Sequence, residues 1–215
     1  MSDCDSYYKC VRKEICYYLP ERYAKVLEVG CGAGVFRKNL TPECEYLGVE
    51  PCDKAVTEAR QNGLPVLHGF FDGVANQIPD GYYDLVICND VIEHMANPDK
   101  FLSDIKRKIA PGGVIVGSYP NIRFLFAMKH VLWDRDWCYA DGGVFDRTHL
   151  RFFTMKSFKR MVLEQGYVIE KMSGIYRGKF PGWYKYAFAL FFIPALFLGF
   201  DTPYSQIGFR IRPSL

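Results

Sequence analysis

The sequence predicts an α/β fold in which a doubly wound, mostly parallel sheet of seven strands is covered by helices on both faces. Two observations support this. Short apolar runs alternate with helical segments along the chain, as in sheets built from strand–helix–strand units. The first such run, Val26–Cys31, leads into three glycines spaced two apart, Gly30, Gly32 and Gly34. The length of 215 residues suits a single domain over 1–215.

The strands are expected where apolar residues gather between turn residues. Tyr83–Asn89 is a continuous apolar run, typical of a buried parallel strand. Gln206–Arg212 alternates, as an edge strand does. In chain order we expect strands at Val26–Cys31, Glu45–Glu50, Pro65–Phe70, Tyr83–Asn89, Val114–Ser118, Tyr167–Met172 and Gln206–Arg212.

The helices are expected between these runs. Asp53 and Thr154 are residue types that cap a helix at its first turn. Gly63, Gly112 and Gly166 are types that end one. We expect helices over 5–18, 35–40, 53–60, 98–109 and 155–164. Two stretches, 119–154 and 175–205, are long for loops of a compact domain, and we expect them to act as a lid or as acceptor-binding elements.

Composition excludes several partners. The net charge is only +3 and no long basic run occurs, so we expect no nucleic acid partner. Eight cysteines occur without a Cys-x-x-Cys pair, which argues against a zinc site and for free thiols in the cytoplasm. The first twenty residues are polar and charged, unlike a signal peptide. No set of Asp, Glu and His demands Mg²⁺, so we expect no metal.

One segment departs from this picture. Tyr186–Phe200 holds 15 residues and no charge, which is short of the roughly 20 needed to span a bilayer. A buried helical hairpin broken at Pro194 is one interpretation. The other is a contact through 183–200 with a membrane or with a lipid-linked substrate. The sequence therefore predicts a cytoplasmic protein and leaves membrane association open.

The glycine turn is the most informative motif. Glycine allows positive φ and a close approach of a ligand to the backbone, and the helix that follows offers free N–H groups. A dinucleotide site would need glycine where Val35 stands. The pattern Glu28-x-Gly-x-Gly-x-Gly resembles motif I of the class I S-adenosylmethionine-dependent methyltransferases. The alternative is a plain strand–helix turn that uses glycine for geometry alone.

The resemblance extends from Glu28 to Ser118 and implies a Rossmann-like sheet with an antiparallel last strand. It implies S-adenosylmethionine as cofactor and S-adenosylhomocysteine as product. Ligands of such sheets lie at the carboxyl ends of the strands. Glu50 is expected on the ribose hydroxyls, Phe71 and Asp72 on adenine, and Asp90 with His94 beside the methionine half. The full expected cofactor set is Glu28, Gly30, Cys31, Gly32, Gly34, Glu50, Pro51, Phe71, Asp72, Asn89, Asp90 and His94.

The acceptor side is expected in the run of residues 141–154, where four acidic or basic side chains lie within six residues just before a helix: Asp146, Arg147, His149 and Arg151. One interpretation is structural, with Asp146 paired to a nearby arginine. The other interpretation is that these side chains bind the acceptor and take part in catalysis. His149 is then the first candidate for the general base and His94 the second, each able to supply roughly 10²–10⁴-fold. Asp146 also faces the transferred methyl group, and the acceptor is held by Arg147, Arg151 and, by resemblance, Tyr8 on the leading helix.

The same run, with Trp137 upstream, resembles methyltransferases of cell-surface polysaccharide biosynthesis. The leading prediction is therefore O-methylation of a sugar hydroxyl in glycan or lipid-linked glycan biosynthesis. The pair Glu93-His94 is typical of the branch that methylates quinones, so methylation of a quinone or other small lipidic molecule is the alternative. A third possibility is a non-catalytic protein that binds S-adenosylmethionine.

Overall fold

A computed structural model describes residues 11–177, 199 and 201–214 of the chain. Tyr8 and, apart from Gly199, the apolar segment 186–200 lie outside the described residues. The expectations for them stay predictions.

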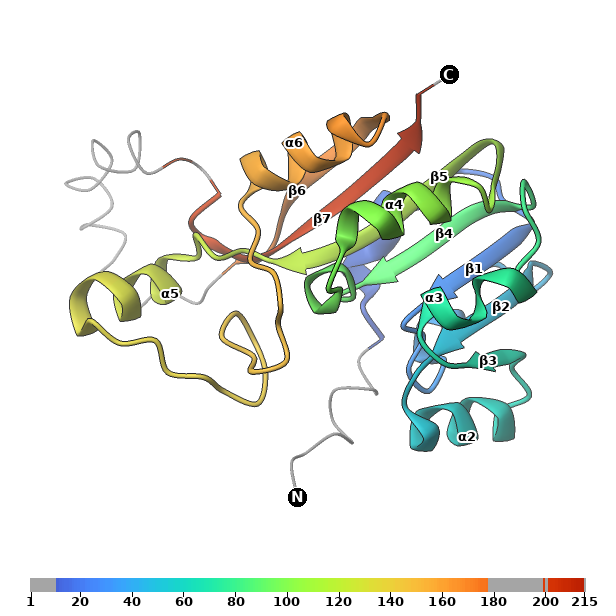
Figure 1. The fold of residues 1–215 in the computed structure, drawn as a ribbon, viewed down its shortest axis with the longest axis horizontal. Coiled ribbons are helices and arrows are strands. Elements are labelled where there is room, and N and C mark those ends of the chain that lie inside the picture. The colour runs from blue at the N-terminus through green and yellow to red at the C-terminus, as the bar shows by residue number, and fades with distance from the viewer. Residues whose placement is uncertain (1–10, 178–198, 200, 215) are drawn as a thin grey trace.

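The structure is built on one seven-stranded sheet of order β3-β2-β1-β4-β5-β7-β6 (Figure 1). Strands β1 to β5 pair in parallel, and β7 lies antiparallel between β5 and β6. This confirms the predicted fold class. The strands are β1 (Lys25–Val29), β2 (Glu45–Glu50), β3 (Val66–His68), β4 (Tyr83–Asn89), β5 (Ile109–Pro120), β6 (Tyr167–Arg177) and β7 (Tyr204–Pro213).

The helices that connect the strands are short. The α-helices are α2 (Asp53–Gln61), α3 (Phe71–Val74), α4 (Pro98–Lys106), α5 (Leu125–Lys129) and α6 (Met155–Glu164). Four 3₁₀ helices, η1 (Lys13–Tyr18), η2 (Val35–Asn39), η3 (Ala75–Gln77) and η4 (Ile92–His94), and a π-helical turn, η5 (His130–Asp134), complete the described elements.

Two apolar cores lie on the two faces of the sheet. Helices α3, α4 and α6 pack on one face, where Phe158 of α6 stacks on Tyr119 of β5 with ring centroids 4.4 Å apart. Helix α2 and the 3₁₀ helices η1 and η2 pack on the other face, around buried residues such as Tyr18. Strand β4 supplies both cores, because alternate side chains point to opposite faces: Leu85 and Ile87 to one, Val86 and Cys88 to the other. This explains its continuous apolar run.

Element ends differ from the expectation where pairing decides them. Strand β5 already begins at Ile109, which pairs with Tyr83, so α4 ends at Lys106 rather than at 109. Cys52, not Asp53, is the residue before α2, and it makes no side-chain cap. The predicted cap of α6 is confirmed, since Thr154 and Ser157 bond to each other's backbone N–H groups.

The insertion begins two residues later than expected, and residues 121–154 form an arm beyond the carboxyl end of β5 that carries α5 and η5 (Figure 1). Asn121 ties its start to the chain entering β7, because its Nδ2 donates to the carbonyls of Asp201 and Tyr204 at 2.9 and 3.0 Å. Among the described residues, no helix is long and apolar enough to cross a membrane. The cysteines of this part of the chain, at 16, 31, 44, 52, 88 and 138, are free thiols.

Candidate functional site

The glycine turn after β1 lies at the carboxyl edge of the sheet, beside the end of β2. Gly30, Gly32 and Gly34 have φ of +71°, +53° and +77°, a region that L-residues avoid. Glu50 closes the turn, since its Oε2 accepts from Gly32 N and its Oε1 from Cys52 N, both at 2.9 Å. A carboxylate has about four lone pairs, so Glu50 can still accept from ribose hydroxyls. Burial raises the pKa of Glu50, although these two backbone hydrogen bonds act to lower it.

Two of the glycines also lie close against neighbouring side chains. A Cβ on Gly34 would lie 2.1 Å from Leu64 Cδ1, and one on Gly30 would lie 2.4 Å from Val91 Cγ2. Val91 belongs to the turn after β4, so Gly30 is where the two turns meet. Packing therefore supports the geometric interpretation of the turn at Gly30 and Gly34, and the ligand-binding interpretation stays a prediction.

Glu28 does not lie on the ligand side of the turn. Its side chain is buried in the body of the sheet and accepts from Tyr46 Oη at 2.6 Å. Burial raises the pKa of Glu28 to about 8, despite that hydrogen bond. Cys31 is buried as well, and burial raises the pKa of its thiol. Glu28 was expected to contact the cofactor directly. In the structure it is instead a buried residue that supports the turn through its hydrogen bond with Tyr46.

The turn after β3 is arranged differently from the expectation. Phe71 is buried and packs edge-on against Phe101 of α4, with ring centroids 5.2 Å apart. Its ring is thus part of the core rather than open to adenine. Phe70, for which no role is expected from the sequence, is 75% exposed and is the aromatic side chain that faces outward here. Asp72 is exposed on the first turn of α3, and Pro51 is exposed after β2.

The turn after β4 holds polar groups that need partners. Neither side-chain atom of Asn89 has a hydrogen-bond partner among the described residues, although both are buried. Asp90 has φ of +52°. Its carboxylate is held by Arg12, by Ser118 Oγ at 2.8 Å and by Gln206 Nε2 at 3.0 Å. Arg12 was missed because it lies 78 residues from Asp90, and no local pattern marks it.

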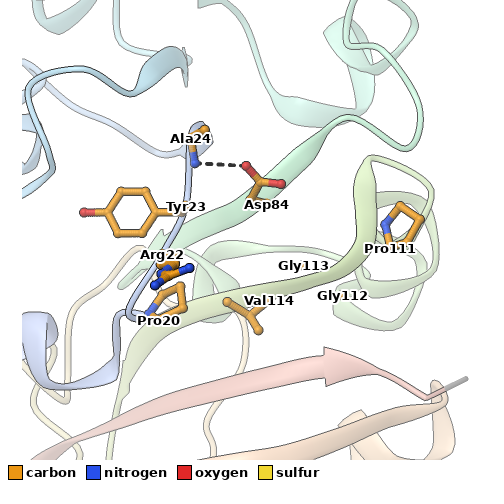
Figure 2. Close-up of a pocket in the computed structure, with 9 residues that line it drawn as sticks. All are labelled: Pro20, Arg22, Tyr23, Ala24, Asp84, Pro111, Gly112, Gly113 and Val114. Carbon is orange, nitrogen blue, oxygen red and sulfur yellow. Dashed lines mark hydrogen bonds between the residues drawn. The ribbon is translucent and has the colours of Figure 1, made fainter.

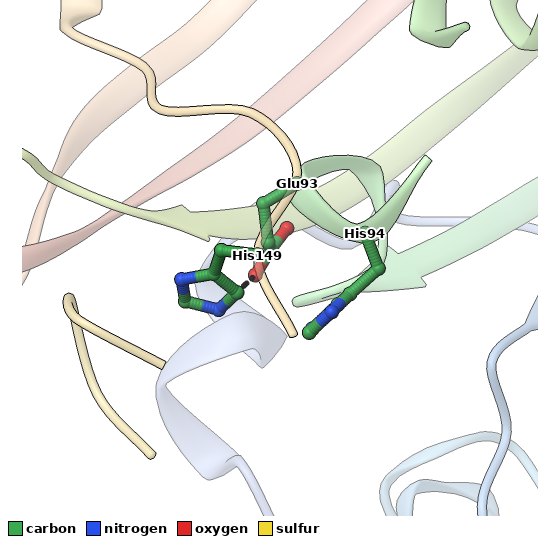
Figure 3. Close-up of side chains that lie close together, drawn as sticks. All are labelled: Glu93, His94 and His149. Atoms are coloured by element: carbon green, nitrogen blue, oxygen red, sulfur yellow. Dashed lines mark ion pairs between the residues drawn. The ribbon is translucent and has the colours of Figure 1, made fainter. Parts of the chain in front are cut away.

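The expected acceptor run folds back onto this turn. Leu150 N and Arg151 N both donate to the carbonyl of Glu93 at 2.9 Å. The imidazoles of His94 and His149 meet edge-on with ring centroids 4.8 Å apart, and His149 Nε2 lies 4.0 Å from Glu93 Oε1 (Figure 3). The fold thus brings the two predicted catalytic histidines together. Glu93, on the turn after β4, lies beside His149 of the folded-back run. Burial, followed by the charge of His94, lowers the pKa of His149.

The other predicted acceptor residues face outward or hold the loop. Asp146 Oδ1 accepts from Thr148 N and Oγ1 at 2.8 and 2.6 Å; although burial opposes it, these bonds lower the pKa of Asp146. Arg147 is exposed and pairs with Asp141 at 2.9 Å. Arg151 donates to the carbonyls of Leu150 and Ala96. Neither arginine pairs with Asp146 as the structural interpretation proposed.

A cavity of about 430 Å³ lies at the opposite edge of the sheet, where the chain enters β1 and β4 (Figure 2). There Asp84 accepts from Ala24 N at 2.9 Å, and Pro111 closes the far side. Ligands of open α/β sheets bind outside the carboxyl ends of the strands. This cavity is therefore not the cofactor site.

Comparison with known proteins decides the family. A family model described as a methyltransferase domain matches residues 8–171. The chain belongs to this methyltransferase family. Its residues fit S-adenosylmethionine, the cofactor of the domain, because Asn89 has unsatisfied donor and acceptor groups and Glu50 has free acceptor capacity at the edge where the glycine turn ends β1.

Solved methyltransferases share the fold. The chain is similar to an S-adenosylmethionine-dependent methyltransferase from Archaeoglobus fulgidus, with a TM-score of 0.67 at 17% identity over 96% of this chain and 93% of that one. It is also similar to one from Mesorhizobium loti, with a TM-score of 0.63 at 16% identity over 93% and 95% of the two chains.

Curated relatives are named for quinone biosynthesis. A ubiquinone biosynthesis O-methyltransferase of Vibrio atlanticus is 31% identical over 114 residues, 48% of each chain. Its counterpart in Aeromonas salmonicida is 24% identical over 169 residues, 75% of this chain and 70% of that one. The chain thus spans about half the length of the first of these relatives.

Proposed function

We propose that this methyltransferase transfers the methyl group of S-adenosylmethionine to a hydroxyl of a small lipidic ring such as a quinol. The observation that carries the proposal is that Gly30 of the glycine turn lies against Val91 of the turn after β4, which also bears His94 in contact with His149. The relatives named for ubiquinone biosynthesis favour this acceptor over a sugar.

The chemistry is an in-line displacement at an activated methyl group. The acceptor oxygen forms a bond to the methyl carbon while the carbon–sulfur bond breaks, and the bonding pair leaves with sulfur as S-adenosylhomocysteine. The protein supplies orientation and helps the hydroxyl to lose its proton. His94 and His149 are the groups proposed to activate the hydroxyl.

Aromatic side chains beside the pair suit a flat acceptor. Trp137 packs edge-on against Phe145 and Phe152 at centroid distances of 4.8 and 5.0 Å, and Phe152 approaches the ring of His149 at 6.2 Å. Trp137 and Phe152 are each 37% exposed, so part of this surface is open. A quinol ring would bury apolar area against it.

A sugar hydroxyl is the second candidate, favoured by the exposed polar groups around the same loop. Arg147 and Asp141 lie there. Arg147 is the kind of side chain that binds the phosphate of a nucleotide-sugar or of a lipid-linked sugar. We also propose a cytoplasmic location and a membrane contact through residues 183–200. Sedimentation with liposomes tests the membrane contact.

A panel of acceptors with a labelled methyl donor tests the function. We expect isothermal titration to show S-adenosylhomocysteine binding, and label to enter catechols and quinols rather than nucleotide-sugars or lipid-linked sugars. Transfer to sugars alone would select the second candidate. Binding without any transfer would favour a non-catalytic protein, and binding of NAD in place of S-adenosylhomocysteine would overturn the proposal.

A further inference from the structure

We propose that Tyr176 and Glu14 are positioning residues for cofactor binding, which act through Arg12. Glu14 lies in η1, directly after Arg12, and Tyr176 lies at the end of β6. Strand β6 runs parallel to β5, because both pair antiparallel to β7, so its end lies at the carboxyl edge of the sheet with the glycine turn. The inference goes beyond the proposed function, because it concerns the cofactor and holds for any acceptor.

A chain of hydrogen bonds runs from Tyr176 to Asp90. Tyr176 Oη donates to Glu14 Oε1 at 2.5 Å, and the same oxygen accepts from Arg12 Nε at 2.6 Å. Arg12 Nη1 in turn donates to Asp90 Oδ2. The guanidinium carbon of Arg12 also lies 5.7 Å from the centroid of the Tyr176 ring. Tyr176 and Glu14 are 162 residues apart in the sequence, so only the fold brings this chain of bonds together.

The planar guanidinium of Arg12 carries the effect to Asp90. Its donors point in fixed directions, so a bond at Nε also sets the direction of the other two nitrogens. Arg12 Nη2 donates to Ser118 Oγ at 2.9 Å and to Gln206 Oε1 at 3.0 Å. Both of these side chains bond Asp90 as well, and the Asp90 side chain is only 6% exposed. Glu14 therefore orients the group that holds a buried carboxylate.

Unfavourable backbone conformations gather in the same cluster. Four non-glycine residues of the described part of the chain have positive φ, and three of them are Arg12, Asp90 and Tyr176, at +52°, +52° and +53°. A residue with a Cβ is disfavoured in this region, so contacts around it must offset the cost. Such conformations are concentrated at functional sites, where the geometry matters more than stability. Three of them in mutual contact favour a functional role for the cluster over packing alone.

Asp90 is the residue through which the cluster reaches the cofactor. The sequence predicts it beside the methionine half, and Gly30 of the glycine turn lies against the neighbouring Val91. Three described side chains donate to the Asp90 carboxylate, which has about four lone pairs and can accept from one more donor. The ammonium group of the methionine half is such a donor. Loss of the bond at Tyr176 would then shift this acceptor without removing it.

Binding of S-adenosylhomocysteine to the full-length protein, measured by isothermal titration, tests the inference. Tyr176→Phe removes the hydrogen bond to Glu14 but keeps the ring, and we expect the Kd to rise about 3–10-fold, since a hydrogen bond to a charged group is lost. Tyr82→Phe is the matched control. Tyr82 Oη donates to Glu45 Oε2 at 2.7 Å, where β4 and β2 begin at the opposite edge of the sheet.

The control separates positioning from a merely structural role. Each substitution removes one bond from a tyrosine to a glutamate, so both should lower resistance to urea by a similar amount. Only Tyr176→Phe should change the Kd of S-adenosylhomocysteine. An unchanged Kd in Tyr176→Phe, or an equal rise in Tyr82→Phe, would overturn the inference and leave the proposed function intact.

Arg12→Lys tests whether Tyr176 acts through Arg12. Lysine keeps a cation beside Asp90 but lacks the planar fork that reaches Glu14 and Asp90 together. We expect Arg12→Lys to weaken binding, and Tyr176→Phe to add no further loss in that background. Should Arg12→Lys fail to fold, Glu14→Ala takes its place, because the effect of Tyr176 also passes through Glu14.

Independent, additive losses in the double variant would contradict the inference, because they would show that Tyr176 affects the cofactor by another route. A wild type that binds S-adenosylhomocysteine but transfers no methyl group would instead contradict the proposed function. In that case the difference between Tyr176→Phe and Tyr82→Phe would still support the inference.

Discussion

The turn after β1 and the turn after β4 lie side by side at the same edge of the sheet, yet they are built in opposite ways. The first is closed on itself: positive-φ glycines set its path, and Glu50 bonds its backbone at 2.9 Å. The second is held from far along the chain, by Arg12 and by the 149–151 run. It also leaves Asn89 and Glu93 without hydrogen bonds among the described residues.

This contrast indicates a division of labour between the turns. A turn whose polar groups are satisfied is preorganised and changes little when the cofactor binds. A turn whose buried polar groups have no hydrogen-bond partner requires a ligand, a water or another group to satisfy them. Reaction chemistry is therefore expected beside β4, and cofactor positioning beside β1.

Removing the distant support of the β4 turn should have the largest effect on stability. Arg12→Met leaves the buried Asp90 carboxylate without its cation, and we expect the free energy of unfolding to fall by about 3–5 kcal/mol. Urea denaturation measures it. The control is Lys100→Met, which breaks the exposed pair with Asp104 and should cost about 0–1 kcal/mol. A similar small loss for Arg12→Met would show that the turn does not depend on this pair.

The acid beneath the β1 turn should make stability depend on pH. Glu28 keeps its proton in the folded state up to about pH 8, whereas an ordinary glutamic acid loses it near 4.5. Between pH 4.5 and 8 the unfolded chain releases this proton while the folded chain keeps it, so ionisation stabilises the unfolded state. The free energy of unfolding should therefore fall by a few kcal/mol as pH rises from 4.5 to 8. Glu28→Gln should flatten this slope and be the more stable protein at pH 8.

Denaturation curves at several pH values give the slope. Glu45→Gln is the control, because Glu45 also accepts from a tyrosine, Tyr82, but does so at the exposed start of β2. Its slope should match that of the wild type. An unchanged slope in Glu28→Gln would show that Glu28 is already ionised in the folded protein.

Glycine substitutions test whether packing or φ matters more in the β1 turn. Gly63→Ala meets no neighbour within 4 Å, so it measures the cost of a positive φ alone, about 1–2 kcal/mol. Gly34→Ala has a similar φ but would press on Leu64, and we expect a further 1–3 kcal/mol, about the cost of overpacking. Equal losses in thermal denaturation would show that Leu64 moves aside at no cost.

The smallest effect is expected where the acceptor run enters α6. Thr154→Ala removes the cap that accepts from Ser157 N at 3.0 Å and should lower the free energy of unfolding by about 1 kcal/mol. Thr57→Ala is the control, since the exposed Thr57 Oγ1 only donates to the carbonyl of Asp53 within α2. A loss no larger than that of the control would show that packing of Phe158, not the cap, fixes the start of α6.

Local patterns predicted the elements of this fold well because helix and strand periods and glycine turns act over a few residues. Strands β2 and β4 and helix α6 have the expected bounds. Element ends were less well predicted where pairing across the sheet decided them, as at Ile109. Side-chain direction was the weaker point of the site prediction: Glu28 and Phe71 stand beside the right turns but point into the protein.

By itself the sequence determined the sheet, the glycine turn and the class of cofactor, since these depend on the order of residues and on what glycine alone allows. Tertiary structure decided the partners. Arg12 reaches Asp90 across 78 residues, and Glu93 meets His149 through the folding back of the acceptor run. No local pattern encodes such meetings, because they arise only when the sheet brings the ends of its strands and the later insertion to one edge.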